Sequence, residues 1–287
     1  MNILVVLRNL YNNPDPFDEE SLLCDSDINV LTEACDLRDT LLEGTNSCVT
    51  ALLVSESQAD YETVLKKAAS YGADRVVHAA LDGFDFSDTN AFARVIAGLI
   101  QSISPMPDVV MFGRLAYDGD SVNIATQTAE NLDWHRAVYS TEVLGISGAP
   151  GFNATPKVAD ETAGCVDATA LLTYKKALDD GGLATIETPL PTVVHTIRRG
   201  GLRRQAKIAD IIRAYNETEV TSVTKAKIEE AAERALSGPR LPKPTQELPP
   251  YRNKGHLEVL NGTSDVDTAS NIIATLKSLG FEPQVKK

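Results

Sequence analysis

Four runs of apolar residues, each followed by a stretch with helical periodicity, occupy residues 3–132 and constrain the fold more than any other feature. Continuous apolar runs of strand length are typical of strands that are buried on both faces of a sheet. Repeated strand–helix units therefore predict a parallel sheet with helices on both faces, joined by right-handed crossovers. The predicted strands are residues 3–7, 49–54, 75–79 and 108–113, and the predicted helices are residues 29–43, 59–71, 87–102 and 119–132.

The expected helix boundaries rest on capping signals. Asn29 is predicted to cap the first helix, because a side-chain oxygen at this position can accept a hydrogen bond from a free backbone N–H. Gly44 and Gly72 are predicted to end the first and second helices, since glycine readily adopts the positive φ found there.

The pattern changes after about Val138. Residues 145–165 are rich in Gly, Ala and Pro, which predicts a loop or a surface excursion. Strand-like runs follow at residues 168–174, 183–187 and 191–196, and the hairpin signal Asp-Asp-Gly-Gly lies between the first two, at residues 179–182. These runs predict an antiparallel extension of the parallel sheet.

The C-terminal part is predicted to be an extended arm. Five prolines lie within residues 239–250, and helical patterns occupy residues 224–236 and 265–279. The arm is too small and too polar to form its own core, so we expect it to pack on a partner or back over the domain. The predicted division is a nucleotide-binding domain at residues 1–214 and an arm at residues 215–287.

Composition excludes several classes of function. The net charge of −13 disfavours nonspecific binding to nucleic acid, because most of the surface would repel a polyanion. The four cysteines and four histidines have no metal-ligand spacing, so we expect no metal site and reduced thiols, some of them in the core. No segment reads as a signal peptide or a membrane span, which predicts a cytoplasmic protein.

The segment from Gly113 to Ile124 is the strongest candidate for a ligand site. It follows the fourth predicted strand, and ligands bind beyond the carboxyl ends of such strands. Gly113 and Gly119 allow a close approach and a tight turn, while free N–H groups near Ser121 and Asn123 can bind a phosphate at a helix start. An ordinary capped turn would have the same residues. Asp118 and Asp120 do not suit an anion site, and neither a P-loop nor a GxGxxG motif is present.

Five basic residues at positions 198–207 form a second candidate site in an otherwise acidic chain. They could meet an acidic partner or a phosphate, although such runs are more often solvated loop surfaces. His195 and Trp134 are interpreted as structural residues. No nucleophile–base set or carboxylate pair indicates catalysis.

Several segments, in this order, resemble the beta subunit of electron transfer flavoprotein, also called the FixA type. The resemblance covers roughly residues 2–215, and it rests on the order and spacing of the segments together. The matching segments are Asn2–Arg8, Asn29–Ala34, Tyr71–Arg75, Gly113–Asp120 with Leu132–Trp134, and Asp180–Leu183 with Leu190–Val194.

The resemblance implies a Rossmann-like fold of the adenine nucleotide alpha hydrolase kind and a heterodimer with an alpha subunit that carries FAD. The beta subunit of this family holds AMP or, in electron-bifurcating members, a second FAD, and the dimer carries electrons between a dehydrogenase and an acceptor. The implied cofactor contacts are Val6, Asn29, Val30, Leu31, Thr32, Ser55, Gly113, Asp118, Gly119, Asp120, Ser121, Val122, Asn123 and Ile124. The implied partner-binding residues are Arg198, Arg199, Gly200, Gly201, Leu202 and Arg203.

The sequence also departs from the family pattern. The Asn-Pro-Phe or Asn-Pro-Asp that opens the first helix of the family is Asn29-Val-Leu31 here, and Gly200-Gly-Leu-Arg-Arg-Gln205 replaces the family's Leu-Asn-Glu-Pro-Arg-Tyr docking run. Without an apolar anchor, a different redox partner or docking through arginines is expected. Two other functions remain open: a regulatory module that binds an adenine nucleotide without a redox role, and an adenylyl-transferring enzyme.

Overall fold

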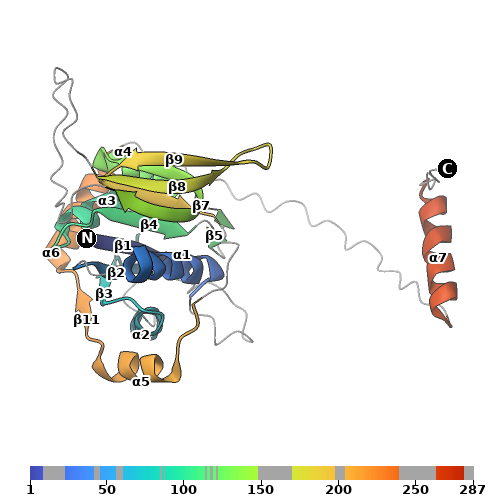
Figure 1. Cartoon of the computed structure of the whole chain (residues 1–287), viewed down its shortest axis with the longest axis horizontal. Coiled ribbons are helices and arrows are strands. Elements are labelled where there is room, and N and C mark those ends of the chain that lie inside the picture. The colour runs from blue at the N-terminus through green and yellow to red at the C-terminus, as the bar shows by residue number, and fades with distance from the viewer. Residues whose placement is uncertain are drawn as a thin grey trace, which may run out of the picture. The chain divides into compact units, whose positions relative to one another are not determined.

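The computed structural model describes two units, Met1–Lys243 and Pro244–Lys287, and each is described by itself (Figure 1). The described residues are 1–8, 23–41, 46–55, 61–84, 86, 88–113, 115–116, 119–120, 122–147, 170–197, 204–238 and 263–280. In the second unit they form one helix, α7 (Asp265–Ser278), which has no buried residue.

The first unit is built on a sheet of nine described strands in the order β11-β3-β2-β1-β4-β10-β7-β8-β9. The strands from β11 to β7 are mutually parallel, and β7, β8 and β9 are antiparallel, which confirms the predicted parallel sheet with an antiparallel extension. The run at residues 191–196, however, was predicted to belong to the extension but forms β10, which is parallel to β4 and β7. Their bounds are β1 Asn2–Arg8, β2 Cys48–Ser55, β3 Arg75–Ala80, β4 Val109–Gly113, β7 His135–Ser147, β8 Leu171–Ala177, β9 Leu183–Pro189, β10 Thr192–Thr196 and β11 Val220–Ser222.

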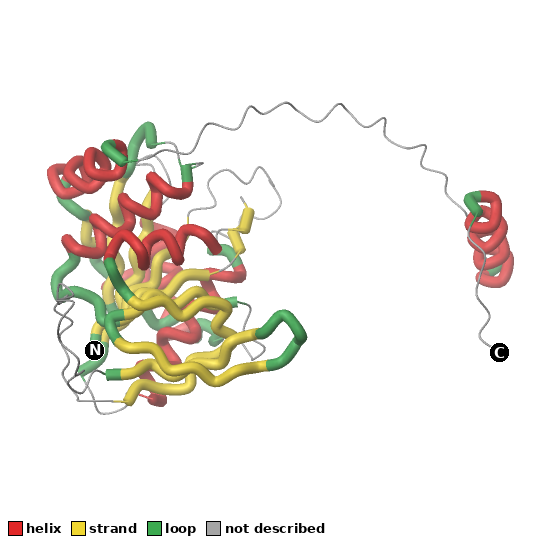
Figure 2. The backbone as a smooth tube through the Cα atoms, turned by 90° about the horizontal axis from the view of Figure 1, so that it is seen from above, coloured by secondary structure: helices red, strands yellow, loops and turns green. Residues whose placement is uncertain are grey.

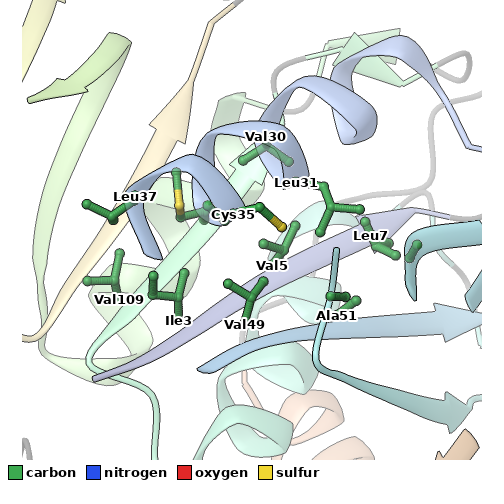
Figure 3. Packing of buried hydrophobic residues seen from close by; sticks show 14 of the residues in the cluster. Ile3, Val5, Leu7, Val30, Leu31, Cys35, Leu37, Val49, Ala51 and Val109 are labelled. Atoms are coloured by element: carbon green, nitrogen blue, oxygen red, sulfur yellow. The ribbon is translucent and has the colours of Figure 1, made fainter. Parts of the chain in front are cut away.

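Helices cover both faces of this sheet. Successive side chains of a strand point to opposite faces, and both faces carry apolar side chains that the helices bury. Ile3, Val5 and Leu7 of β1 pack on one face with α1 and α2, as Figure 3 shows for α1, whereas Leu4 and Val6 pack on the other with α3, α4 and α6. Figure 2 shows the helices beside the strands. The helices of the first unit are α1 Asp25–Asp36, the π-helix η1 Leu37–Leu41, α2 Tyr61–Ser70, α3 Thr89–Ser102, α4 Val122–Leu132, α5 Ile208–Glu217 and α6 Lys225–Leu236.

Helix α1 is buried along its length, from Asp27 to Cys35. One side packs on the sheet, and a second contact comes from β7, where the Val143 N–H donates to Glu33 Oε1 at 2.7 Å. The antiparallel extension therefore also covers the first helix. Helices α3 and α6 are in close contact at Gly98, where an added Cβ would lie 2.8 Å from the Cβ of Ala231.

Several predicted boundaries are wrong. Helix α1 begins at Asp25, after the cap Cys24, so Asn29 lies inside the helix and is not its cap. β7 continues to Ser147, into the stretch predicted as a loop from residue 145, and residues 148–165 lie outside the described residues. Gly44 also lies outside them, while Gly72 ends α2 with a φ of 119°, as predicted.

The first unit extends beyond the boundary predicted at residue 214, which falls within α5. β11 pairs with β3, and Ile228, Ala231 and Ala235 of α6 are buried in the core. Residues 215–243 therefore belong to this unit. The packing of residues 215–287 on a partner subunit stays a prediction. Among the described residues, no helix combines the length and the apolar character needed to cross a membrane.

Candidate functional site

The chain reverses direction across the sheet at β1. It runs outward from β1 to β2 and β3, then returns to the other side of β1 at β4. In a parallel sheet this arrangement opens a crevice at the carboxyl ends of the two central strands, where ligands bind. Ser55 of β2 and Gly113 of β4 lie at that edge, as the sequence predicted.

Gly113 is in close contact with the first turn of α1. A Cβ at this position would lie 2.5 Å from Ser26 Oγ and 3.0 Å from the Ser26 carbonyl oxygen. The prediction explained this glycine by the approach of a ligand, whereas the structure shows that the α1 backbone fills the space. Its immediate role is to let helix and strand meet at the crevice.

The first turn of α1 brings acidic side chains to this edge. The N–H of Asp27 donates to Cys24 Sγ at 3.4 Å, and Asp25 and Asp27 both lie in the first turn. The helix dipole stabilises these carboxylates, and their charge disfavours a phosphate while suiting hydroxyl or amino donors of a ligand. The sequence analysis missed them, although cap-type residues immediately before the apolar run at Ile28 are the usual signal of a helix start.

The first-helix residues carried over by the family resemblance lie deeper than the edge. Asn29, Val30, Leu31 and Thr32 are buried in the second turn of α1 and the one after it. The side chain of Val6 packs in the core on the α3 and α4 face, so only its backbone can reach a ligand. These contacts stay predictions.

Ser55 is part of a packed polar cluster. Its Oγ lies 2.9 Å from His78 Nε2, and the Tyr61 ring stacks on the His78 ring with centroids 3.9 Å apart and an interplanar angle of 6°. Burial lowers the pKa of His78, although the nearby Asp82 acts in the opposite direction, so the imidazole is neutral at pH 7. The sequence analysis named Ser55 but not His78 or Tyr61.

The loop from Gly113 to α4 includes a short antiparallel ribbon. β5 (Leu115–Ala116) pairs with β6 (Gly119–Asp120), and α4 begins at Val122. Helix α4 thus starts directly after this loop, close to the predicted position. Asn123 is exposed in its first turn and Ile124 is buried in the core, while Asp118 and Ser121 lie outside the described residues.

The predicted partner-binding residues 198–203 also lie outside the described part of the chain. The next residue, Arg204, forms an ion pair with Asp39 of η1 at 2.6 Å. Arg204 is therefore tied to the protein surface and is not simply a solvated side chain of the basic stretch.

The described cysteines are buried or half-buried. Burial raises the pKa of both Cys24 and Cys35 to about 12, so they stay protonated at neutral pH. Cys48 is also free, which agrees with the expected reduced thiols, and Cys165 lies outside the described residues. Within the described ranges, no group of three or more His, Cys, Asp or Glu side chains could hold a metal ion.

The strand order is that of a doubly wound α/β protein, which reverses at β1, the place where proteins of this class bind ligands. The model of the electron transfer flavoprotein domain matches residues 17–236, and the chain belongs to this family. Members of this family are flavoprotein electron carriers.

Curated relatives agree with this assignment. The electron transfer flavoprotein subunit beta of Thermoanaerobacterium thermosaccharolyticum is 28% identical over 235 residues, which cover 78% of each chain. Protein FixA of Rhizobium meliloti is 28% identical over 216 residues, 74% of this chain and 65% of its own. The subunit beta of Bos taurus is 23% identical over 232 residues, 80% of this chain and 75% of its own. The function is therefore that of the beta-type subunits of electron transfer flavoproteins.

Proposed function

We propose that this chain binds AMP, or the ADP half of a second FAD, in the crevice at the carboxyl ends of β1 and β4. The observation that carries the proposal is the start of α4 directly after the β4 loop, at the point where strand order reverses. The first N–H groups of a helix have no partner within the helix, and the dipole favours an anion beside them. We assign the phosphate to Ser121, Val122 and Asn123.

The nucleoside half is assigned to the opposite side of the crevice. Asp25 and Ser26 carry oxygens that can accept hydrogen bonds from sugar hydroxyls or an amino group, whereas Asp27 is only 1% exposed; Ser55 carries a hydroxyl at the end of β2. Carboxylates on this side and a helix N-terminus on the other match a ligand with one neutral and one anionic end. The carboxyl edge thus suits a nucleotide, which has a neutral nucleoside at one end and a phosphate at the other.

In this proposal the chain pairs with an alpha subunit, and the cytoplasmic heterodimer carries electrons between a dehydrogenase and an acceptor. The FAD of the dimer would supply the redox chemistry, while this chain would help to bind and orient the FAD and to shield it from solvent. The arginines at positions 198, 199 and 203 are proposed to meet an acidic surface of the redox partner.

The test is the nucleotide content of the purified heterodimer. The wild-type complex should contain either one FAD and one AMP, or two FAD. Ser121→Asp should remove the AMP or the second FAD, because it places a negative charge against the phosphate. Asn131→Asp is the matched control: it adds the same charge at the exposed other end of α4 and should leave the content unchanged.

Two results would contradict the proposal. A wild-type complex without AMP or FAD in this subunit would exclude the nucleotide site, and an unchanged content in Ser121→Asp would exclude the phosphate assignment. Reversible nucleotide binding by a chain that forms no yellow complex with an alpha subunit would favour the regulatory module.

A further inference from the structure

The side chains of Ser55 and His78 meet across two neighbouring strands. The register of β2 and β3 places Leu53 beside His78, so Ser55 lies two residues further toward the carboxyl edge. Both residues are only 3% exposed, and Ser55 Oγ lies 2.9 Å from His78 Nε2. This contact lies on the α1 and α2 face of the sheet, on the side of the proposed nucleoside site.

Two backbone hydrogen bonds hold the strands that carry this pair. The Leu81 N–H donates to the Ser55 carbonyl oxygen, and the Val223 N–H donates to the His78 carbonyl oxygen, each at 2.8 Å. Tyr61 stacks on the imidazole and fixes the plane of the ring. The main remaining freedom of Ser55 is rotation about χ1, which has three staggered wells.

We propose that His78 is a positioning residue for the nucleotide: it holds the Ser55 hydroxyl in one rotamer, so that the hydroxyl meets the nucleoside half without first losing rotational freedom. This inference rests on the proposed nucleotide site and adds a residue to it. A hydroxyl can take part in more than one hydrogen bond, as donor and as acceptor. A group that is oriented before binding loses less conformational entropy when the ligand binds.

His78 is buried beside Ser55 and Tyr61, and burial favours its neutral form. A neutral imidazole has one N–H and one lone pair, so it can either accept the Ser55 hydroxyl hydrogen or donate to its oxygen. Both arrangements hold Ser55 in the same rotamer. The direction of the bond decides only whether Ser55 offers the ligand a hydrogen or a lone pair.

The experiment is a double-mutant cycle on the nucleotide-depleted heterodimer, with AMP as the probe. His78→Phe keeps an aromatic ring for Tyr61 to stack on but removes the ring nitrogens. Ser55→Ala removes the hydroxyl. Each change alone should weaken AMP binding by about tenfold, as expected for one hydrogen bond. The double variant should also lose only about tenfold, because His78 acts through Ser55.

Two further variants separate positioning from a structural role. Ser55→Thr keeps a hydroxyl and should retain most of the affinity, and Tyr61→Phe keeps the stacked ring and should behave as the wild type. Melting temperatures are measured for every variant. If His78→Phe fails to fold, His78→Leu replaces it in the cycle, since it also fills the space while removing the ring nitrogens.

The outcomes distinguish the two levels of inference. Wild-type affinity in His78→Phe, or losses that multiply to about a hundredfold in the double variant, would overturn the positioning role. A wild-type complex that binds no AMP and retains no FAD in this subunit would overturn the nucleotide site itself, whatever the variants do.

Discussion

At the amino ends of the parallel strands, carboxylates accept hydrogen bonds from backbone N–H groups and an arginine, whereas a hydroxyl, a neutral imidazole and a glycine lie toward the carboxyl ends. Asp108 accepts from the Asn2 N–H at 2.8 Å. Asp74 accepts from the Val49 N–H at 2.7 Å and from Arg38 at 2.6 Å. At the opposite edge lie the Ser55–His78 contact and the approach of Ser26 to Gly113.

We therefore expect the amino edge to serve stability and the carboxyl edge to serve the proposed ligand binding. The acidic side chains of the amino edge satisfy N–H groups at the starts of strands, so their charge is used within the fold. The groups assigned to the ligand at the carboxyl edge also include carboxylates, but these lie at a helix start, where the dipole stabilises them. Changes at the amino edge should therefore leave nucleotide binding intact.

The largest effect is expected from Gly113→Val, which should reduce both stability and nucleotide binding. The new side chain would collide with the Ser26 backbone, which cannot rotate away as a side chain can. We expect a loss of about 1–3 kcal/mol in the free energy of unfolding, together with loss of nucleotide, measured by urea unfolding and by nucleotide content. Gly145→Val is the matched control, because a Cβ there meets nothing within 4 Å. Retention of both properties in Gly113→Val would contradict the packing described here.

An intermediate effect is expected from Asp74→Ala, which should affect stability alone. It removes an acceptor from the buried Val49 N–H and a partner from Arg38, and we expect a loss of about 1–2 kcal/mol in the free energy of unfolding. Solvent screens the ion pair, since the Asp74 side chain is 42% exposed, so most of the loss should come from the N–H group. The AMP affinity should not change. Asp179→Ala, on the exposed β8–β9 turn, is the control, and a weakened AMP affinity in Asp74→Ala would show that the edges are coupled.

The smallest effect is expected from mild acid, which should lower the free energy of unfolding through His78 and, at a lower pH, through Asp39. The pKa of His78 is lowered by burial from its ordinary value of 6.5, with Asp82, Tyr61 and Ser55 as its polar neighbours. Below about pH 6.5 the unfolded chain therefore takes up a proton before the folded one, and stability falls by at most about 1.4 kcal/mol per pH unit. His78→Phe should remove this slope, measured as urea midpoints between pH 7.5 and 4.5.

Asp39, the ion-pair partner of Arg38, should respond at lower pH. The pKa of Asp39 is lowered from 3.8, because its hydrogen bonds and ion pairs with Arg38 and Arg204 outweigh the opposing effect of burial. Its contribution to stability is present above pH 3.8 and is lost as the pH falls below that value. An unchanged slope between pH 6.5 and 4.5 in His78→Phe would assign the acid sensitivity to another group.

The parallel part of the fold could be predicted because its first four strands are short, mainly apolar segments, each followed by a helical pattern. β7 could not, since its burial alternates irregularly around two bulges and the positive φ of Tyr139. α5 has one buried residue, Ala214, so its helical pattern gave little sign of packing, and β11 has only three residues. These elements depend on contacts with α2 and β3, which are distant in sequence.

The candidate site was predictable where it depends on strand ends. Ser55 and Gly113 follow buried runs, and the carboxyl ends of parallel strands share an edge. His78 was not predictable, because its meeting with Ser55 depends on the register of β2 against β3. The first turn of α1 was assigned four residues too late, since Cys24 is an unusual cap and Asn29 is a common one.

The late addition of β11 and α6 has a consequence for biosynthesis. A ribosome delivers about 5–20 residues per second, so β3 leaves the exit tunnel on the order of ten seconds before the strand that completes its outer edge. During that interval the nascent chain presents an open sheet edge and the apolar surface of α3 that α6 later covers. An unpaired edge can associate with other chains. Translation that stalls before Val220 would therefore yield fragments prone to aggregation, even though every strand around the proposed nucleotide site had already been made.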